Sequence, residues 1–369
     1  MKILIKPQET FFFRDARPFD KGEGWASGIF PPLPSTVYGA FRTAAISQKS
    51  TIAEYYDTAK KISIRTEMGS PITYGSFCIR SLLLHNRYGC LVPMPLDLLE
   101  DENNNLYALI PNNRKIISDL SFDFYMSLNP GFEEPKVSWL DCYGIKDYLF
   151  GKSKIDIRKS EKLLIEEEIK TGIEKNPNKG SAEEHMLYVQ KMLRLNDSYE
   201  FSVDADNISS VDTEGILKIG HDGRMFSYRI TDGGNFNSLN SSKDYIINEI
   251  EKNKKFKILF TSPAILENGW APRGVEKPDY IWQPTDSLKI KIKSAVLGKP
   301  MRVGGWDMKT KQPKLMRKAV SPGSVYYCEL VKGTVSELFD ALFDKNISDA
   351  DDNLAKQRFG HILIGAMSR

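Results

Sequence analysis

The chain has 369 residues, of which 41% are hydrophobic and 27% charged, a composition typical of a globular protein with one or two domains. Its net charge of +3 excludes a uniformly basic polycation. No apolar run approaches the roughly 18 residues that a membrane helix needs, and the first residues, MKILIKPQE, are too short and too interrupted for a signal peptide. We therefore expect a cytoplasmic protein that does not bind membranes.

Positive charge is concentrated in one segment. Residues 289–318 hold ten Lys or Arg and a single acid, Asp307, so this segment carries about +9 and the rest of the chain, by difference from +3, about −6. A polyanion would be attracted to this part of the molecule. The four cysteines form no C-x-x-C pair and share no spacing with histidines, so we expect free, mostly buried thiols, no metal and no cofactor.

In chain order, the first predicted element is a strand at residues 2–7, ended by Pro7. Residues 11–34 contain too many Gly and Pro for a regular element and predict a long loop. A helix should follow Pro34, with Ser35 as its N-cap. Its core-facing stripe, at i, i+3, i+4 spacing, is Val37, Ala40, Phe41, Ala44 and Ala45. We expect its exposed face to carry Ser35, Tyr38, Gly39 and Arg42.

The middle of the chain predicts mostly strands. Residues 77–99 predict a hairpin with its turn near 85–89, and residues 106–111 a further strand. Short helical patterns occupy residues 140–170, of which SEKLLIEEEIK (160–170) is the clearest. Strands are predicted at 187–195, 199–205, 215–220 and 225–230, and then a helix at 243–255.

The last third begins with FKILFTSPAIL (256–266), whose apolar order and terminating proline resemble residues 1–11, a weak sign of internal duplication. Lys alternates with apolar residues from 288 to 296, which predicts a strand with one lysine face that runs into a Gly-rich loop. Thr334 and Glu337 form a capping box for a last helix, and the acidic segment 344–353 is expected to be disordered. This order of elements favours α+β domains over a parallel doubly wound sheet.

Catalytic motifs are scarce. Residues 151–153 (GKS) resemble the end of a phosphate-binding loop, but the pattern needs glycine where the chain has Lys146, so a helix-ending turn is the better interpretation. The four histidines, at 85, 185, 221 and 361, lie far from one another in sequence. His221 has Asp222 and Arg224 beside it, but its flanking glycines favour a turn residue.

Two segments could instead bind a polyanion. The first is the loop 11–34 with the start of the following helix, because a helix N-terminus offers unpaired N–H groups to phosphate and arginine holds phosphate oxygens with a planar fork. Its candidate residues are Arg14, Arg17, Ser35, Thr36, Tyr38, Gly39 and Arg42. The alternative is that Arg14 and Arg17 only pair with nearby acids: Asp15, Asp20 or Glu23.

The second segment is the basic stretch ending in KPMRVGGWD. Gly304 and Gly305 would allow a ligand to approach the backbone, Trp306 could stack on a base, and Lys299 and Arg302 could contact phosphates. The alternative is an ordinary hairpin with a solvated lysine face. Aromatic residues within a strongly basic stretch favour single-stranded nucleic acid, and unpaired RNA in particular, over that alternative.

Several segments are similar to the motifs of one known family. Residues 11–44 contain F-F-R-D-x-R-P-F, then glycines, F-P-P-x-P-S-T and a G-A-x-R helix. Further similar segments are IKTGIE (169–174), Leu187-Tyr188, VGGWD (303–307) and AVSPGSVYYCEL (319–330). Together they resemble the third subunit of the CRISPR type III-B RAMP module, the Cmr complex.

This resemblance implies two ferredoxin-like (RAMP/RRM-like) domains with antiparallel sheets and long loop insertions, which we place at residues 1–155 and 156–369. It implies a subunit of an antiviral ribonucleoprotein that does not cleave RNA. Such a subunit holds the 5′ tag of the CRISPR RNA and bridges the large polymerase-like subunit and the first backbone subunit. The family's C-terminal Gly-rich loop departs here, because His361 interrupts G-F-G in KQRFGHILIG (356–365). The sequence leaves open whether this loop or Gly304–Gly305 contacts RNA.

Two other functions remain as alternatives. The first is a metal-independent CRISPR-RNA-processing endoribonuclease, since related RAMP folds cut repeat RNA. Tyr38 and Lys299 could serve there, but no histidine lies in either candidate segment. The second is a protein scaffold whose basic strand contacts an acidic partner.

Overall fold

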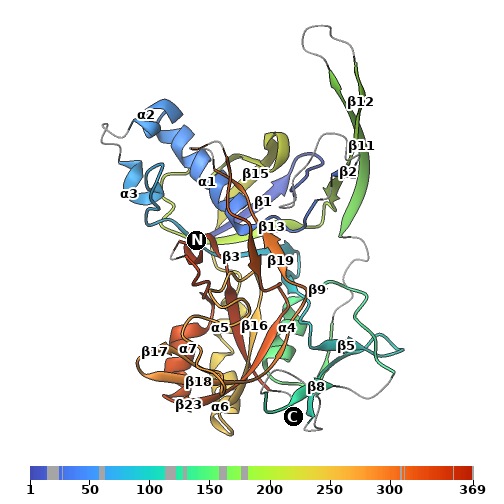
Figure 1. Cartoon of the computed structure of the whole chain (residues 1–369), viewed down its shortest axis with the longest axis vertical. Coiled ribbons are helices and arrows are strands. Elements are labelled where there is room, and N and C mark those ends of the chain that lie inside the picture. The colour runs from blue at the N-terminus through green and yellow to red at the C-terminus, as the bar shows by residue number, and fades with distance from the viewer. Residues whose placement is uncertain are drawn as a thin grey trace.

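The structure is a computed structural model that describes residues 1–14, 25–26, 28–57, 63–112, 122–127, 131–157, 164–175, 182–307, 310, 312–351 and 353–367. An upper and a lower lobe lie against each other, and a long hairpin arm projects from the upper lobe (Figure 1). In the part of the chain that the structure describes, no helix has the length and apolar character needed to span a membrane.

The upper lobe is built on a seven-stranded sheet with the order β14-β15-β1-β13-β3-β4-β9. Its neighbouring strands are antiparallel. The strands are β14 (Glu214–Ile219), β15 (Arg224–Thr231), β1 (Lys2–Pro7), β13 (Glu200–Asp206), β3 (Cys78–Asn86), β4 (Gly89–Pro93) and β9 (Trp139–Leu140). The strands predicted at 2–7, 199–205, 215–220 and 225–230 and the hairpin at 77–99 are therefore confirmed.

Helix α1 (Pro34–Lys49) packs against this sheet through the predicted apolar stripe, whose members Val37, Phe41 and Ala45 are buried. Ser35 is not its N-cap: Leu33 is, and Pro34 takes the first helical position, where a missing N–H costs nothing. The short helices α2 (Ile52–Tyr56) and α3 (Ile64–Met68) follow it.

Tyr38 does not lie on an exposed face of α1, contrary to the sequence expectation. Its side chain is only 3% exposed. Its ring stacks on Phe77 with a centroid distance of 4.7 Å, and its hydroxyl donates to the Phe77 carbonyl at 3.4 Å. The inward position gains aromatic packing, and burying the hydroxyl costs little because it still donates to a carbonyl acceptor.

An insertion between β4 and β13 builds the right-hand side of the molecule in Figure 1. It contains β5 (Leu98–Glu100), β6 (Leu106–Ala108), β7 (Ile110–Asn112), β8 (Tyr125–Ser127), α4 (Cys142–Leu149), β10 (Lys154–Ile155) and the arm strands β11 (Ile165–Lys175) and β12 (Ala182–Leu195). β2 (Trp25–Ala26) joins the arm as a parallel third strand. β12 confirms the strand predicted at 187–195.

The helix predicted at 160–170 is wrong over its described residues, which form the start of β11. The helix of this region is α4, earlier in the chain. Pairing with β12 makes this segment a strand, because Ile165 lies opposite Leu195 and two glutamates of β11 form ion pairs with basic residues of β12. Glu167 pairs with Lys191 at 2.9 Å, and Glu168 pairs with Arg194.

The lower lobe is built on a six-stranded antiparallel sheet with the order β17-β18-β23-β16-β25-β24. The strands are β17 (Ile281–Thr285), β18 (Leu288–Val296), β23 (Val325–Lys332), β16 (Lys255–Phe260), β25 (His361–Ala366) and β24 (Lys345–Asn346). Helices α6 (Lys243–Glu251) and α7 (Val335–Leu342) pack with it, and α7 begins at the predicted capping box of Thr334 and Glu337. α5 (Asn237–Asn240) and the 3-10 turns η1 (His221–Gly223) and η2 (Ala355–Gln357) are the remaining helical elements of the described residues.

A basic hairpin, residues 297–319, projects from the end of β18. It contains β19 (Met301–Val303) paired with β22 (Arg317–Ala319), and β20 (Trp306–Asp307) paired with β21 (Gln312–Pro313). β18 confirms the predicted alternating strand, whose apolar members Leu288, Ile290 and Ile292 are buried.

The acidic segment 344–353 is ordered where the structure describes it, contrary to the expectation of disorder. The Asp349 carboxylate accepts the backbone N–H groups of Glu267 at 2.8 Å and Arg273 at 2.5 Å. The Ser348 hydroxyl accepts the N–H of Ile265 at 2.9 Å. These side chains serve as acceptors for a neighbouring loop, so composition alone gave the wrong expectation.

The predicted α+β class is confirmed at the level of mixed helices and mostly antiparallel sheets. Residues of the insertion, including Met94, Leu98 and Tyr148, share a hydrophobic core with Phe256 and Ile258 of the lower sheet. The upper sheet has a separate core beneath α1. The boundary near residue 155 stays a prediction.

Candidate nucleic-acid interface

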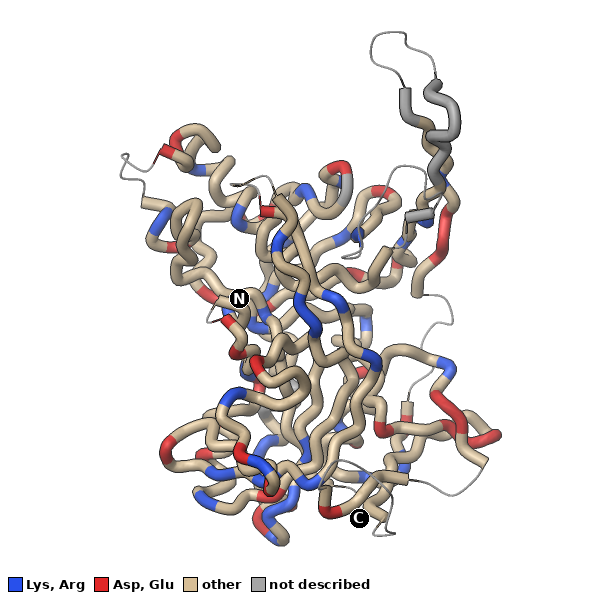
Figure 2. Tube along the Cα trace, viewed as in Figure 1, with Lys and Arg blue, Asp and Glu red and all other residues tan. Residues whose placement is uncertain are grey.

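The basic hairpin presents its charge outward. Alternate residues of a strand point to opposite faces, and here Val303 and Ala319 are buried while Arg302 and its cross-strand neighbour Lys318 are exposed. Lys299 and Lys314 are also exposed. Blue segments follow the two strands of this hairpin in the centre of Figure 2. The outward face is therefore suited to an anionic partner.

Exposed apolar side chains accompany this charge. Trp306 is 55% exposed, and Leu315, between β21 and β22, is 79% exposed. The exposed Trp306 ring in this basic setting is suited to stacking against a nucleic-acid base, and Leu315 adds apolar surface beside it. A Cβ on Gly305 would meet only the Lys314 Cδ, at 3.6 Å, so packing within this chain does not require glycine there.

The start of α1 supplies part of the first predicted segment. Ser35 and Thr36 are half-buried in its first turn, and Arg14 is exposed on a short backbone bridge to Gly28. A Cβ on Gly39 would meet nothing within 4 Å, although glycine in a helix interior costs about 1 kcal/mol relative to alanine. Arg17 lies outside the described residues.

Arg42 does not project freely from α1, as the sequence expectation had it. Its guanidinium donates to the Tyr55 hydroxyl at 2.6 Å, to the Thr73 carbonyl at 3.2 Å and to the Ser70 carbonyl. It also lies 5.8 Å from the ring centroid of Tyr74. Arg42 therefore ties α1 to α2 and to the loop after α3, and these bonds occupy donors that a phosphate would use.

The lysine face of β18 is not solvated throughout. Lys291 and Lys293 pair with Asp123 at 3.1 and 3.0 Å, and Lys293 also pairs with Glu329 at 2.6 Å. Burial alone would raise the pKa of Asp123, but the bonds from the two lysines outweigh it and lower the pKa. The basic stretch of the sequence thus divides into a neutralised strand and an exposed hairpin.

A small apolar cluster joins the two predicted segments. Leu33, which caps α1, packs with Val303 and Ala319 of the basic hairpin, and Phe359 and Ile265 complete the cluster. Ile29 and Met301 pack against it. Sequence reasoning missed this cluster, since its members are ordinary apolar residues up to about 330 positions apart; only Val303, between Arg302 and Gly304, hinted at a buried face.

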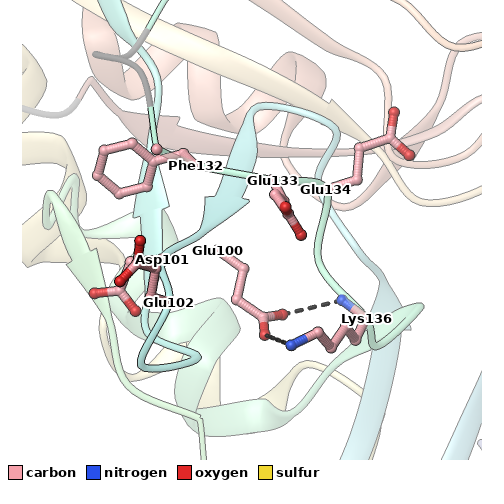
Figure 3. Close-up of a pocket in the computed structure, with 8 residues that line it drawn as sticks. Glu100, Asp101, Glu102, Phe132, Glu133, Glu134 and Lys136 are labelled. Atoms are coloured by element: carbon pink, nitrogen blue, oxygen red, sulfur yellow. Dashed lines mark hydrogen bonds and ion pairs between the residues drawn. The ribbon is translucent and has the colours of Figure 1, made fainter.

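One pocket of about 290 Å³ lies in the insertion, away from these segments (Figure 3). It is lined by Phe132, Gly131, Lys136 and five acids: Glu100, Asp101, Glu102, Glu133 and Glu134. Lys136 is engaged with Glu100, through its backbone N–H at 3.0 Å and its ammonium at 3.6 Å. The surplus of carboxylates makes this pocket unsuited to phosphate.

The chain resembles known proteins in two ways. A family model described as CRISPR-associated protein (Cas_Cmr3) matches residues 3–367. Among solved structures, a chain of the type III-B Cmr-beta complex bound to cognate target RNA and AMPPnP is 16% identical, with a TM-score of 0.49 over 89% of this chain and 86% of that one. A chain of the Csm3-Csm4 subcomplex of the type III-A interference complex is 14% identical, with a TM-score of 0.38 over 100% and 99%.

No curated protein matches the sequence. The family match, in contrast, spans almost the whole chain, from the first strand of the upper sheet to the end of the last strand of the lower sheet. It includes both segments of the candidate interface. The chain therefore belongs to the Cmr3 family of CRISPR-associated proteins.

Proposed function

We propose that this type III-B CRISPR effector subunit binds the 5′ tag of the CRISPR RNA along the basic hairpin and the start of α1. The observation that carries the proposal is the cluster of Leu33, Val303 and Ala319, which holds these two segments together. The outward faces of both segments then form one surface with exposed Arg302, Lys318 and Trp306. Such a surface suits an unpaired strand, whose phosphates meet cations and whose bases stack on aromatic rings.

A salt titration tests this proposal. Purified protein should bind a short single-stranded RNA that bears the tag, and affinity should fall steeply as salt rises. Arg302→Ala and Lys318→Ala should each reduce the slope of log K against log salt by about 0.7. Lys289→Ala is the control, because Lys289 lies at the other end of β18, roughly 20 Å of strand from the hairpin. Salt-independent binding, or none even beside partner subunits, would contradict the proposal.

We propose further that the subunit is not a nuclease. Of the two residues that could serve the endoribonuclease, Tyr38 and Lys299, Tyr38 is buried, and burial raises its pKa further above neutral. Burial also lowers the pKa of His85 to about 4, and His361 is fully enclosed. Incubation of labelled repeat RNA with the subunit in EDTA should leave the RNA intact, whereas a cyclic-phosphate product would favour the endoribonuclease.

The strand orders support two ferredoxin-like units. A βαββαβ unit of this kind has its strands in the order 4-1-3-2. The orders β15-β1-β13-β3 and β25-β16-β23-β18 both follow it. The upper unit retains its first helix, α1, and the lower unit its second, α7, while β14 and residues 261–280 occupy the other two connections. In both units the long insertion follows the second strand, and the basic hairpin is the lower unit's insertion.

We also propose that the subunit bridges the large polymerase-like subunit and a backbone subunit, as its family resemblance implies. The projecting arm supports this, since Ile169 on β11 is 68% exposed. Ile169→Ser should weaken co-purification with one of these partners and leave RNA binding by the isolated subunit unchanged. Ile216→Ser, on the edge strand β14, is the matched control. Equal co-purification of wild type and both variants would exclude the arm from the bridge.

A further inference from the structure

The chain contains a loop whose position suits a structural task rather than ligand contact. Residues 353–361 connect the acidic segment to the last strand, β25, and include η2. Gln357, Arg358, Phe359 and His361 are each at most 6% exposed. A Cβ on Gly360 would lie 2.6 Å from the Ser348 backbone nitrogen, so the loop also packs tightly against the backbone at Ser348. An RNA strand could reach none of these four side chains without displacing protein.

The loop bonds to both lobes. Toward the upper lobe, the Gln357 amide donates to the Tyr74 hydroxyl at 3.0 Å, and the Lys356 ammonium donates to the Gly75 carbonyl at 3.1 Å. Toward the lower lobe, the Ser262 hydroxyl donates to the Arg358 carbonyl at 2.7 Å and accepts the His361 N–H at 2.8 Å. The loop therefore fixes the two lobes relative to each other.

His361 and Arg358 anchor the loop inside the lower lobe. The His361 ring bonds to Thr261 at 2.5 Å and to Asp344 at 2.9 Å. The buried guanidinium of Arg358 donates to the Thr261 carbonyl at 3.5 Å and to the Thr261 hydroxyl at 3.4 Å. Burial lowers the pKa of Arg358, and the carboxylates of Asp204, on β13 of the upper sheet, and Asp344, in the lower lobe, oppose this shift. Replacing Arg358 by a neutral residue would remove both bonds to Thr261 and the attraction to one acid of each lobe.

Phe359 extends the loop to the candidate interface. Its ring, 1% exposed, packs in the cluster with Leu33 of the upper lobe and with Val303 and Ala319 of the basic hairpin. Phe359 therefore contacts both segments of the candidate interface. Any shift of the loop would move the hairpin relative to the start of α1.

We propose that residues 353–361 form a positioning element that holds the basic hairpin against the upper lobe through Gln357 and Phe359 without contacting RNA. This inference rests on the proposed function for its effect on RNA, but the positioning itself does not. In this proposal the hairpin with Gly304 and Gly305 contacts the RNA. The C-terminal loop, at the position of the family's Gly-rich loop, lies in the protein interior in this chain. Arg358 and Gln357 are then positioning residues.

Hydrogen exchange of the full chain without RNA tests the positioning. Arg358→Gln and the milder Gln357→Ala should both accelerate exchange in residues 28–36 and 301–319. Gln8→Ala is the matched control, since the Gln8 amide, like that of Gln357, donates to two acceptors, here the Ser227 hydroxyl at 2.7 Å and the Lys6 carbonyl at 3.5 Å, both within the upper lobe. Unchanged exchange in the hairpin of a folded variant would overturn the proposal. Because this readout needs no RNA, it stands even if wild-type protein binds none and the proposed function fails.

A double-mutant cycle tests whether the effect on RNA passes through the hairpin. If Arg302→Ala and Gln357→Ala each weaken binding about tenfold, the pair should weaken it far less than the about hundredfold expected of independent sites. Photoreactive RNA should crosslink within 299–319 and not within 353–361. Multiplicative effects, or crosslinks to residues 356–361, would overturn the proposal and make the loop a direct RNA contact.

Discussion

Lys257, in the centre of β16, is a charged residue in the core of the lower lobe. Its side chain is 0% exposed, and its ammonium has no hydrogen-bond partner among the described residues. It lies 3.4 Å from the ring centroid of Tyr148, whose hydroxyl donates to the buried Asp97 at 2.8 Å. Burial lowers the pKa of Lys257 from 10.5 to about 8, although Asp97 opposes the shift. We predict that Lys257→Met stabilises the protein at neutral pH.

The magnitude follows from the pKa difference. A shift from 10.5 to about 8 corresponds to about 3 kcal/mol at about 1.4 kcal/mol per unit. Below pH 8 both folded and unfolded chains are protonated, so the full cost of burying the charge applies. Between pH 8 and 10.5 the unfolded chain binds more protons, so the stability of the wild type rises with pH. The Met variant should be more stable by up to about 3 kcal/mol at pH 7, and this advantage should shrink above pH 8.

Urea unfolding followed by circular dichroism between pH 7 and 9.5 measures this difference. The range ends below pH 10 because burial raises the pKa of Tyr148 and Tyr327, so ionisation of tyrosine in the unfolded chain would then lower stability. Lys255→Met, at the exposed start of the same strand, is the control and should leave the pH profile unchanged. A Met variant that is less stable at pH 7, or one whose stability rises with pH as in wild type, would refute the reasoning.

Three further predictions concern other parts of the chain. Gly360→Ala should lower the free energy of unfolding by about 2 kcal/mol or more, because both the φ of 75° and the contact with Ser348 oppose a Cβ. Gly269→Ala, where φ is 76° but the surrounding space is open, should lower it by about 1 kcal/mol. Thermal or urea unfolding measures both losses, and equal losses would contradict this reasoning. Arg42→Gln should lower the free energy of unfolding by about 2 kcal/mol, because it removes the charged donor that bonds to the Tyr55 hydroxyl and to the carbonyls of residues 70 and 73. A fall in RNA affinity at unchanged stability would instead make Arg42 an RNA contact. His85 should remain neutral down to about pH 5, because its pKa is about 4, and should destabilise the fold only as pH falls below 6.5; proton NMR showing titration near 6.5 would contradict this.

The local elements of this protein could largely be predicted from the sequence. A short apolar run ended by Pro7 identified β1, the alternation of Lys with apolar residues identified β18, and the capping box of Thr334 and Glu337 identified the start of α7. Such patterns are local, since they depend on the geometry of one strand or one turn. The two segments of the candidate interface were also visible, because charge, glycine and aromatic residues are features of composition.

Predictions failed where a distant partner decided the outcome. The glutamates of β11 favour a helix by themselves, but cross-strand pairs with β12 made them a strand. Arg42 and Tyr38 have the spacing of an exposed helix face, yet carbonyls and rings from residues 70–77 turned both toward the protein. Lys291 and Lys293 of β18 form ion pairs with Asp123, about 170 positions away, so their charge is already balanced within the protein.

The sequence by itself determined which segments carry the basic, glycine-rich and aromatic residues, and it determined the family through motifs spread along the chain. Only the tertiary structure decided that Leu33, Val303, Ala319 and Phe359 meet in one cluster, which brings two segments about 270 residues apart into contact. The physical reason is that apolar burial is non-directional and independent of sequence separation. No local pattern records which buried residues will pack together.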